Sequence, residues 1–236
     1  MFDGSRGRGQ AEIMVALDES SLDEACRLMD LLEGRARFYK VGLQLFTAAG
    51  PAAIEAVQAR GARVFLDLKL HDIPNTVASA VRSAQGWGVD MLTIHLGGGP
   101  EMAATAVDAA KGKLAVVGVT VLTSSNQETL RACGVEGPLD RQVVRLAEMG
   151  YAAGVRGFVA SAWELPALRT KFGAEPLLII PGVRPVGSFV GDQKRVATPS
   201  EVVQGGASHL VIGRPISQAE DPAASYDAIA TEIATA

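Results

Sequence analysis

The sequence predicts an α/β fold: a single-domain (β/α)8 barrel of the TIM type. The chain has 236 residues, of which 48% are hydrophobic and 20% charged, and α/β barrels commonly reach this length as one domain. From Ala11 onward, short apolar runs alternate with longer segments of helical spacing. This alternation indicates repeated βα units and a parallel sheet, and eight such units close a barrel.

Eight apolar runs have the length expected of buried strands. They are Ile13–Leu17, Tyr39–Val41, Val64–Leu68, Met91–Ile94, Leu114–Leu122, Gly157–Ala160, Leu177–Ile180 and His209–Ile212. The segments between them place apolar residues at helical spacing. The clearest examples are Ser21–Leu32, Ala52–Arg60, Val77–Gly88, Asp140–Met149 and Ala223–Ala234.

The two ends of the chain differ in character. The first ten residues contain Gly and Arg but no apolar run, so we expect residues 1–10 to form a loose tail and residues 11–236 to form the barrel domain. Near the other end, Thr198–Glu201 (TPSE) offers an N-cap, a proline at the first helical position and a capping-box acid. The long polar insertion Val183–Ala197 is expected to be the loop after strand seven.

Composition excludes several classes of protein. A net charge of −4 provides no broad basic field for nucleic acid or a membrane surface, so an anionic ligand must be held by a few placed cations. The two cysteines, Cys26 and Cys133, have neither disulfide-framework nor metal-finger spacing. No secretion signal or membrane span is evident, because no run of about 18 apolar residues occurs. We therefore expect a cytoplasmic protein.

The third apolar run places an acid and an amine among leucines. Because side chains alternate along a strand, Asp67 and Lys69 share one face with Phe65. The opposite face carries Val64, Leu66, Leu68 and Leu70. We expect the charged pair to point into the barrel mouth and the aliphatic residues to meet the helices, since catalytic groups of barrels lie at the carboxyl ends of the strands.

Charges in a partly desolvated mouth must pair, because a lone buried charge shifts its pKa and becomes neutral. From this strand alone, the pair could be a structural ion pair or part of an active site, since both perturb pKa values. Charged residues at other predicted strand ends favour the active site. They are Asp18, Lys40, Asp72, Arg184 and Arg214.

One segment carries a specific resemblance. Asp67–Val77 (DLKLHDIPNTV) resembles the signature segment of the orotidine 5'-phosphate decarboxylase family. Six shorter motifs resemble that family's motifs in the same order. They are Ala16–Asp18 (ALD), Lys40–Gly42 (KVG), Val121–Ser124 (VLTS), Pro181–Pro185 (PGVRP), Gly191–Gln193 (GDQ) and Ile212–Ile216 (IGRPI).

The resemblance implies decarboxylation of orotidine 5'-monophosphate to uridine 5'-monophosphate, the last step of de novo synthesis of that nucleotide, without metal or organic cofactor. It implies that Lys40, Asp67, Lys69 and Asp72 form an alternating charge array around the substrate carboxylate and C6. Loss of carbon dioxide leaves a carbanion at C6, so preorganised cations must stabilise negative charge there. Lys69 is the candidate for that task and for protonating C6.

The resemblance also implies the binding groups. Phosphate capture falls to Arg184, Gln193, Gly213 and Arg214, and the ends of strands seven and eight are where barrels commonly bind phosphate. Asp18 and Lys40 are implied near the ribose hydroxyls, and Thr123 at the pyrimidine edge, with Ser124 left open.

Two further residues are implied to come from the second subunit of a homodimer. Asp72 and Thr76 are expected to reach the partner's site, so each site would draw Lys69 from one chain and Asp72 from the other.

Several alternatives remain open at this point. Asp72 could simply be the N-cap of the third helix. Ser125 and Glu128 have capping-box spacing, so Ser124 could serve a helix start. His71, within the Asp67–Val77 motif, and His95, before the glycines at 97–99, have no assigned role.

Two other functions are also possible. A metal-dependent decarboxylase or aldolase acting on a sugar phosphate could share Asp67, Lys69 and Asp72, but Lys40 argues against it because a lysine repels a divalent cation. A non-catalytic nucleotide-binding barrel is the second alternative, since fold alone does not establish function.

Overall fold

The protein, represented by a computed structural model that describes residues 11–185 and 197–236, is a closed barrel of parallel strands in the order β1 to β8. The strands are β1 Glu12–Leu17, β2 Phe38–Gly42, β3 Arg63–Leu70, β4 Met91–His95, β5 Ala115–Val119, β6 Gly157–Val159, β7 Leu177–Pro181 and β8 His209–Ile212. The barrel closes because β8 pairs with β1, with Val15 opposite Ile212. The predicted (β/α)8 barrel is confirmed.

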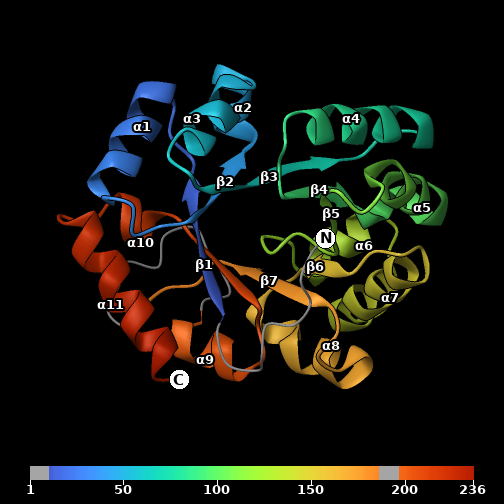
Figure 1. Ribbon diagram of the computed structural model, residues 1–236. Coiled ribbons are helices and arrows are strands. Elements are labelled where there is room, and N and C mark those ends of the chain that lie inside the picture. Colours follow the sequence, from blue (N-terminus) through green and yellow to red (C-terminus); the bar gives the residue numbers. More distant parts are fainter. Residues whose placement is uncertain (1–10, 186–196) are drawn as a thin grey trace.

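Helices surround the strands as an outer ring (Figure 1). The α-helices are α1 Leu22–Leu31, α2 Leu43–Ala49, α3 Ala52–Gln58, α4 Pro74–Gly86, α5 Gly99–Ala110, α6 Gln127–Ala132, α7 Leu139–Ala152, α8 Leu165–Phe172, α9 Pro199–Gln204, α10 Arg214–Ser217 and α11 Pro222–Ala234. Two short 3-10 turns, η1 Leu96–Gly98 and η2 Ala162–Glu164, precede α5 and α8. No helix of these described segments is long and apolar enough to cross a membrane.

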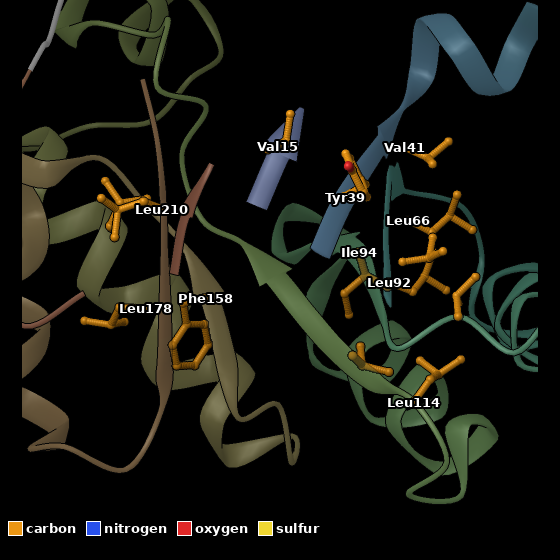
Figure 2. Close-up of a cluster of buried hydrophobic side chains, with 14 of the residues drawn as sticks. Val15, Tyr39, Val41, Leu66, Leu92, Ile94, Leu114, Phe158, Leu178 and Leu210 are labelled. Carbon is orange, nitrogen blue, oxygen red and sulfur yellow. The ribbon is translucent and has the colours of Figure 1, made fainter. Parts of the chain in front are cut away.

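The alternation of side chains along each strand divides the core into two parts. Residues facing outward pack against the helices in the larger cluster, which includes Val15, Leu66 and Phe158 (Figure 2). A smaller cluster fills the inside of the barrel and includes Met14 and Phe65. In β3 the expected faces are confirmed, because Phe65 lies in the inner cluster and Leu66 in the outer one.

The amino ends of the strands are closed by a charged cluster. Arg63 forms an ion pair with Glu12, and its guanidinium lies 4.2 Å from the centre of the Phe38 ring. The same Glu12 carboxylate lies 3.7 Å from Nε2 of His209, which is buried. These residues begin β1, β2, β3 and β8, so this end of the barrel is sealed by polar contacts rather than left open.

Helix starts test two of the sequence predictions. The capping box at α9 is confirmed, since Thr198 accepts a hydrogen bond from the Glu201 backbone and the Glu201 side chain accepts one in return. The capping box expected at Ser125 is wrong: Asn126 is the N-cap of α6, and its side chain accepts from the Thr129 N–H. An Asx cap one residue later competes successfully because Asn is among the strongest N-caps.

Strand five is shorter than predicted. The sequence predicts one strand over the apolar run Leu114–Leu122, but β5 ends at Val119. The last residues of the run, Val121 and Leu122, line a cavity beyond the strand end. Their apolar character therefore reflects the cavity wall rather than continued pairing in the sheet.

The outer core should dominate stability. Phe158 of β6 is fully buried, and the centre of its ring lies 5.7 Å from that of Phe172 in α8. Phe158→Ala is expected to lower the free energy of unfolding by about 3–5 kcal/mol, because it removes buried apolar surface and leaves a cavity. Urea unfolding at fixed protein concentration measures this. The exposed Trp163 offers a control, since Trp163→Ala should change stability by only about 0.5 kcal/mol. Equal losses in the two variants would contradict this account.

Candidate active site

A cavity of about 700 Å³ opens at the carboxyl ends of the strands. Residues from the ends of β1, β2, β3, β5, β6, β7 and β8 line it. Its floor is apolar and includes Phe65, Ile179 and Val211, which belong to the inner core. Its charged wall comes from the first three strands, so a small anionic ligand would lie on an apolar floor beside fixed charges.

Four charged side chains meet in this wall. Lys69 Nζ lies 2.7 Å from Asp67 Oδ2, and Lys40 Nζ lies 3.9 Å from the same oxygen. Lys40 Nζ also donates to Asp18 Oδ1 at 2.7 Å. Lys40 and Asp67 are buried at 8% and 9% exposure, while the Lys69 side chain is 30% exposed. The signs alternate from Asp18 through Lys40 and Asp67 to Lys69, so each buried charge has an opposite neighbour.

The backbone of Lys69 is unusual. Its φ is +51°, a left-handed conformation that costs a non-glycine residue on the order of 1 kcal/mol. The pairing of β3 with β4 shifts at the same place: Leu66 is opposite Leu92, but Leu70 is opposite Ile94. The three residues of β3 between these pairs, 67–69, are therefore opposite a single residue of β4, Thr93. This bulge ends the regular alternation just where the Lys69 side chain is directed to Asp67.

Space for the Lys40 ion pair depends on a glycine. A Cβ built on Gly42 would lie 2.7 Å from Lys40 Nζ and 2.9 Å from Asp18 Oδ1. Any larger residue would require the two charged groups to move. Gly42 lies in the motif Lys40–Gly42, and no local sequence pattern predicts this role for it.

Two arginines reach the cavity from the ends of β7 and β8. Arg184, at 6% exposure, follows β7, and Arg214 begins the short helix α10 directly after Gly213. Gly213 lies beside β1, where a Cβ would be 3.4 Å from that of Ala16. The cavity thus has an acid–lysine array at β1 to β3 and two guanidinium groups at β7 and β8. Gln193 lies outside the described residues.

An acid between these two groups was not predicted. Glu19 lines the cavity next to Asp18, and its Oε2 is buried without a hydrogen-bond partner among the described residues. Burial raises the pKa of the Glu19 carboxyl above its ordinary value, and the carboxylates of Asp18 and Glu24 act in the same direction. The position of Glu19 just after the predicted strand Ile13–Leu17 is the feature of the sequence that could have indicated a site residue.

The comparisons with known proteins agree with this geometry. A model of the "Orotidine 5'-phosphate decarboxylase / HUMPS family" matches residues 11–229. The chain belongs to this family. The expectation that rested on the sequence motifs is confirmed.

Members of the orotidine 5'-phosphate decarboxylase family match nearly the full chain. The chain is 48% identical to an orotidine 5'-phosphate decarboxylase of Moorella thermoacetica, over 97% of this chain and 94% of that protein. It is 49% identical to the corresponding protein of Halorhodospira halophila, over 97% and 98%. A crystal structure of orotidine 5'-phosphate decarboxylase from Lactobacillus acidophilus superposes with a TM-score of 0.85 at 33% identity, covering 95% of this chain and 99% of that one.

The predicted site residues of this family member fall into two groups. Most of them line the one cavity; these are Asp18, Lys40, Asp67, Lys69, Thr123, Arg184, Gly213 and Arg214. By contrast, Asp72 and Thr76 are exposed and lie outside that lining. Ser124 is also exposed and outside it.

Asp72 is not a helix cap. The N-cap of α4 is Ile73, whose side chain makes no capping bond, and Pro74 begins the helix. Asp72 instead accepts a hydrogen bond from the adjacent Ile73 N–H at 2.7 Å. The simple structural alternative for Asp72 is therefore wrong, because the proline at the first helical position shifts the cap to the residue before it.

Two histidines stack beside the bulge. The rings of His71 and His95 lie 5.3 Å apart at an interplanar angle of 16°. Nδ1 of His95 accepts a hydrogen bond from the Gly97 N–H at 3.2 Å, so this nitrogen carries no proton. Burial lowers the pKa of His95 below its ordinary value, and neighbouring His71 and Lys69 act in the same direction.

Neutral His95 should make stability depend on pH. Because its folded-state pKa lies below the unfolded value of about 6.5, the unfolded chain binds a proton first as pH falls. The stabilisation is complete above that value and is lost as pH falls through the lower folded-state pKa. We expect His95→Asn to lose less stability than the parent between about pH 7.5 and pH 5.5, measured as urea midpoints. Identical losses in the two proteins would show that His95 does not contribute.

Proposed function

We propose that this chain decarboxylates orotidine 5'-monophosphate to uridine 5'-monophosphate and carbon dioxide, the last step of de novo synthesis of that nucleotide. Membership of the orotidine 5'-phosphate decarboxylase family supports this reaction. The observation that carries it in the site is the array in which Lys40 and Lys69 flank the buried carboxylate of Asp67. We also infer that the protein acts in the cytoplasm.

The array suits the charge change of the reaction. When the bond from C6 to the carboxylate breaks, the electron pair stays on C6 and carbon dioxide leaves. The Lys69 ammonium stabilises this charge and then gives a proton to C6, and it regains a proton from solvent. Because Asp67 holds Lys69 Nζ at 2.7 Å before substrate arrives, little reorganisation is needed in the transition state.

The rest of the cavity would bind the nucleotide. Arg184 and Arg214 supply charge-assisted donors for the phosphate, with the backbone at Gly213 close to it and Gln193 as a further donor. Asp18 and Lys40 would contact the ribose hydroxyls, and Thr123 the pyrimidine edge. Phosphate binding at one end then orients C6 at the other, so that binding energy remote from the reaction lowers its barrier.

The metal-dependent alternative fits the site less well. Lys40 Nζ lies between the carboxylates of Asp18 and Asp67, where a divalent cation would need those oxygens as ligands. Over residues 11–185 and 197–236, no group of three or more His, Cys, Asp or Glu side chains is arranged to hold a metal ion. The chemistry proposed here requires no cofactor.

A direct assay tests the reaction. Chelator-treated protein is expected to convert orotidine 5'-monophosphate to uridine 5'-monophosphate, followed by the loss of substrate absorbance. Lys69→Ala should lower kcat by about 10³-fold or more, because it removes both the stabilising cation and the proton donor. The exposed Lys113 lies on the amino side of β5, and Lys113→Ala is the matched control, expected to keep full activity.

The opposite results would be equally informative. A folded parent that leaves the substrate unchanged refutes the proposed function and directs attention to metal-supplemented assays with sugar phosphates. Full activity in Lys69→Ala would show that another group protonates C6.

We propose further that the active enzyme is a homodimer in which each subunit contributes residues to the site of the other. Asp72 and Thr76 lie outside the cavity of their own chain, although Asp72 is only three residues from Lys69. The adjacent Ile73 is 67% exposed, which is unusual for an isoleucine and suits a residue covered by a partner. In a two-fold dimer, Asp72 and Thr76 would then complete the partner's site.

Subunit mixing tests the exchange. Lys69→Ala and Asp72→Ala chains should each be inactive alone. After exchange at equal concentration, half of the dimers are mixed and each holds one intact site, so roughly a quarter of all sites become active. No recovery, with exchange verified by a tagged chain, would place Asp72 in the site of its own chain.

A further inference from the structure

Thr93 lies at the centre of the bulge that carries Lys69. It is the middle residue of β4 and is fully buried, at 0% exposure. Leu66 pairs with Leu92 before it and Leu70 with Ile94 after it, so Thr93 alone faces three residues of β3. Its neighbours Leu92 and Ile94 belong to the outer core and Met91 to the inner core, so the Thr93 hydroxyl is a polar group within apolar surroundings.

The Thr93 hydroxyl makes two hydrogen bonds, both to charged residues of the array. Its oxygen accepts from the backbone N–H of Lys69 at 2.8 Å. Its proton is donated to Asp67 Oδ1 at 3.0 Å. At the bulge, the Thr93 hydroxyl is thus the acceptor for the Lys69 N–H.

These bonds complete a closed ring. Asp67 Oδ1 is held by Thr93, and its other oxygen, Oδ2, is held by Lys69 Nζ at 2.7 Å. Lys69 is therefore fixed at both ends, by its backbone N–H and by its ammonium group. A side chain with four rotatable bonds gains a defined position only when such contacts restrict it.

We propose that Thr93 is a positioning residue for the decarboxylation, which sets the orientation of Asp67 and the left-handed backbone of Lys69. It does not line the cavity, so it acts through these two residues rather than on the substrate. The inference rests on the proposed function, because it assigns Thr93 a part in placing the group that protonates C6.

Loss of the hydroxyl would release both groups together. Without it, the Lys69 N–H loses this acceptor, and Asp67 Oδ1 is free to turn towards Lys40, whose Nζ is 3.9 Å from the other oxygen. Either change moves Lys69 Nζ away from its present place. The arginines that follow β7 and β8 make no contact with the Thr93 hydroxyl, so nucleotide binding should survive.

Thr93→Val tests this because valine has nearly the same shape without the hydroxyl. We expect kcat to fall about 10- to 100-fold, the scale of a misplacement of about 1 Å, while KM and the affinity for uridine 5'-monophosphate stay close to the parent values. Thr93→Ser keeps the hydroxyl and should restore most of kcat. A parent that is itself inactive would refute the proposed function and is thereby distinguished from failure of this inference.

A second buried threonine provides the matched control. Thr120 is also at 0% exposure, and its hydroxyl donates to the backbone carbonyl of Val159 at 3.0 Å, not to a charged group. Thr120→Val should reduce stability to a similar extent but keep kcat. Equal loss of kcat in Thr93→Val and Thr120→Val would overturn the inference, since the effect would then be one of packing.

Two other results would also overturn it. An active parent with unchanged kcat in folded Thr93→Val shows that Lys69 needs no help from Thr93. If Thr93→Val does not fold, Thr93→Ser and Thr93→Ala are compared, because these two differ only in the hydroxyl. A kcat about tenfold higher in the serine variant supports the inference, and equal values refute it.

Discussion

The arrangement of the site depends on one buried carboxylate. Asp67 is 9% exposed, and such an anion is stable in a desolvated place only if opposite charges and hydrogen-bond donors surround it. Lys69, Lys40 and Thr93 meet that need from three different strands. Because the barrel holds those strands in fixed register, the cations that stabilise Asp67 are also held where a carbanion would form.

Both ends of the barrel contain charged groups, but they are used differently. At the amino ends, Arg63, Glu12 and His209 pack against Phe38 and seal the interior. At the carboxyl ends the charges border an open cavity instead. Polar residues at the closed end contribute to stability, whereas those at the open end retain unfilled space next to them, as ligand binding requires.

The site contains local strain that its neighbours stabilise. Lys69 adopts a left-handed backbone conformation within a bulge, and Gly42 lacks a side chain where Lys40 and Asp18 meet. Neither feature would be selected for stability alone, since an ideal strand would carry no bulge there. Strain at the residue proposed to protonate C6 agrees with a site in which position matters more than local stability.

By itself, the sequence determined the barrel, the family and most residues of the cavity. Hydrophobic periodicity reports which side chains are buried, and ordered motifs report shared ancestry, so both survive without coordinates. Boundaries were less certain: the run that ends with Val121 and Leu122 was read as strand, because an apolar cavity wall and an apolar strand have the same composition. The Asx cap at Asn126 was missed for a similar reason, since two adjacent residues both had capping chemistry.

Tertiary structure alone decided the contacts between strands. Thr93 and Glu19 do not belong to any of the recognised motifs. Only the register of β4 against β3 brings the Thr93 hydroxyl to Asp67 and Lys69. The left-handed backbone conformation of Lys69 could not be predicted either, because a regular alternation of side chains predicts the correct face without a bulge. Pairing across strands depends on distances between residues far apart in the chain, and no local pattern of residues encodes those distances.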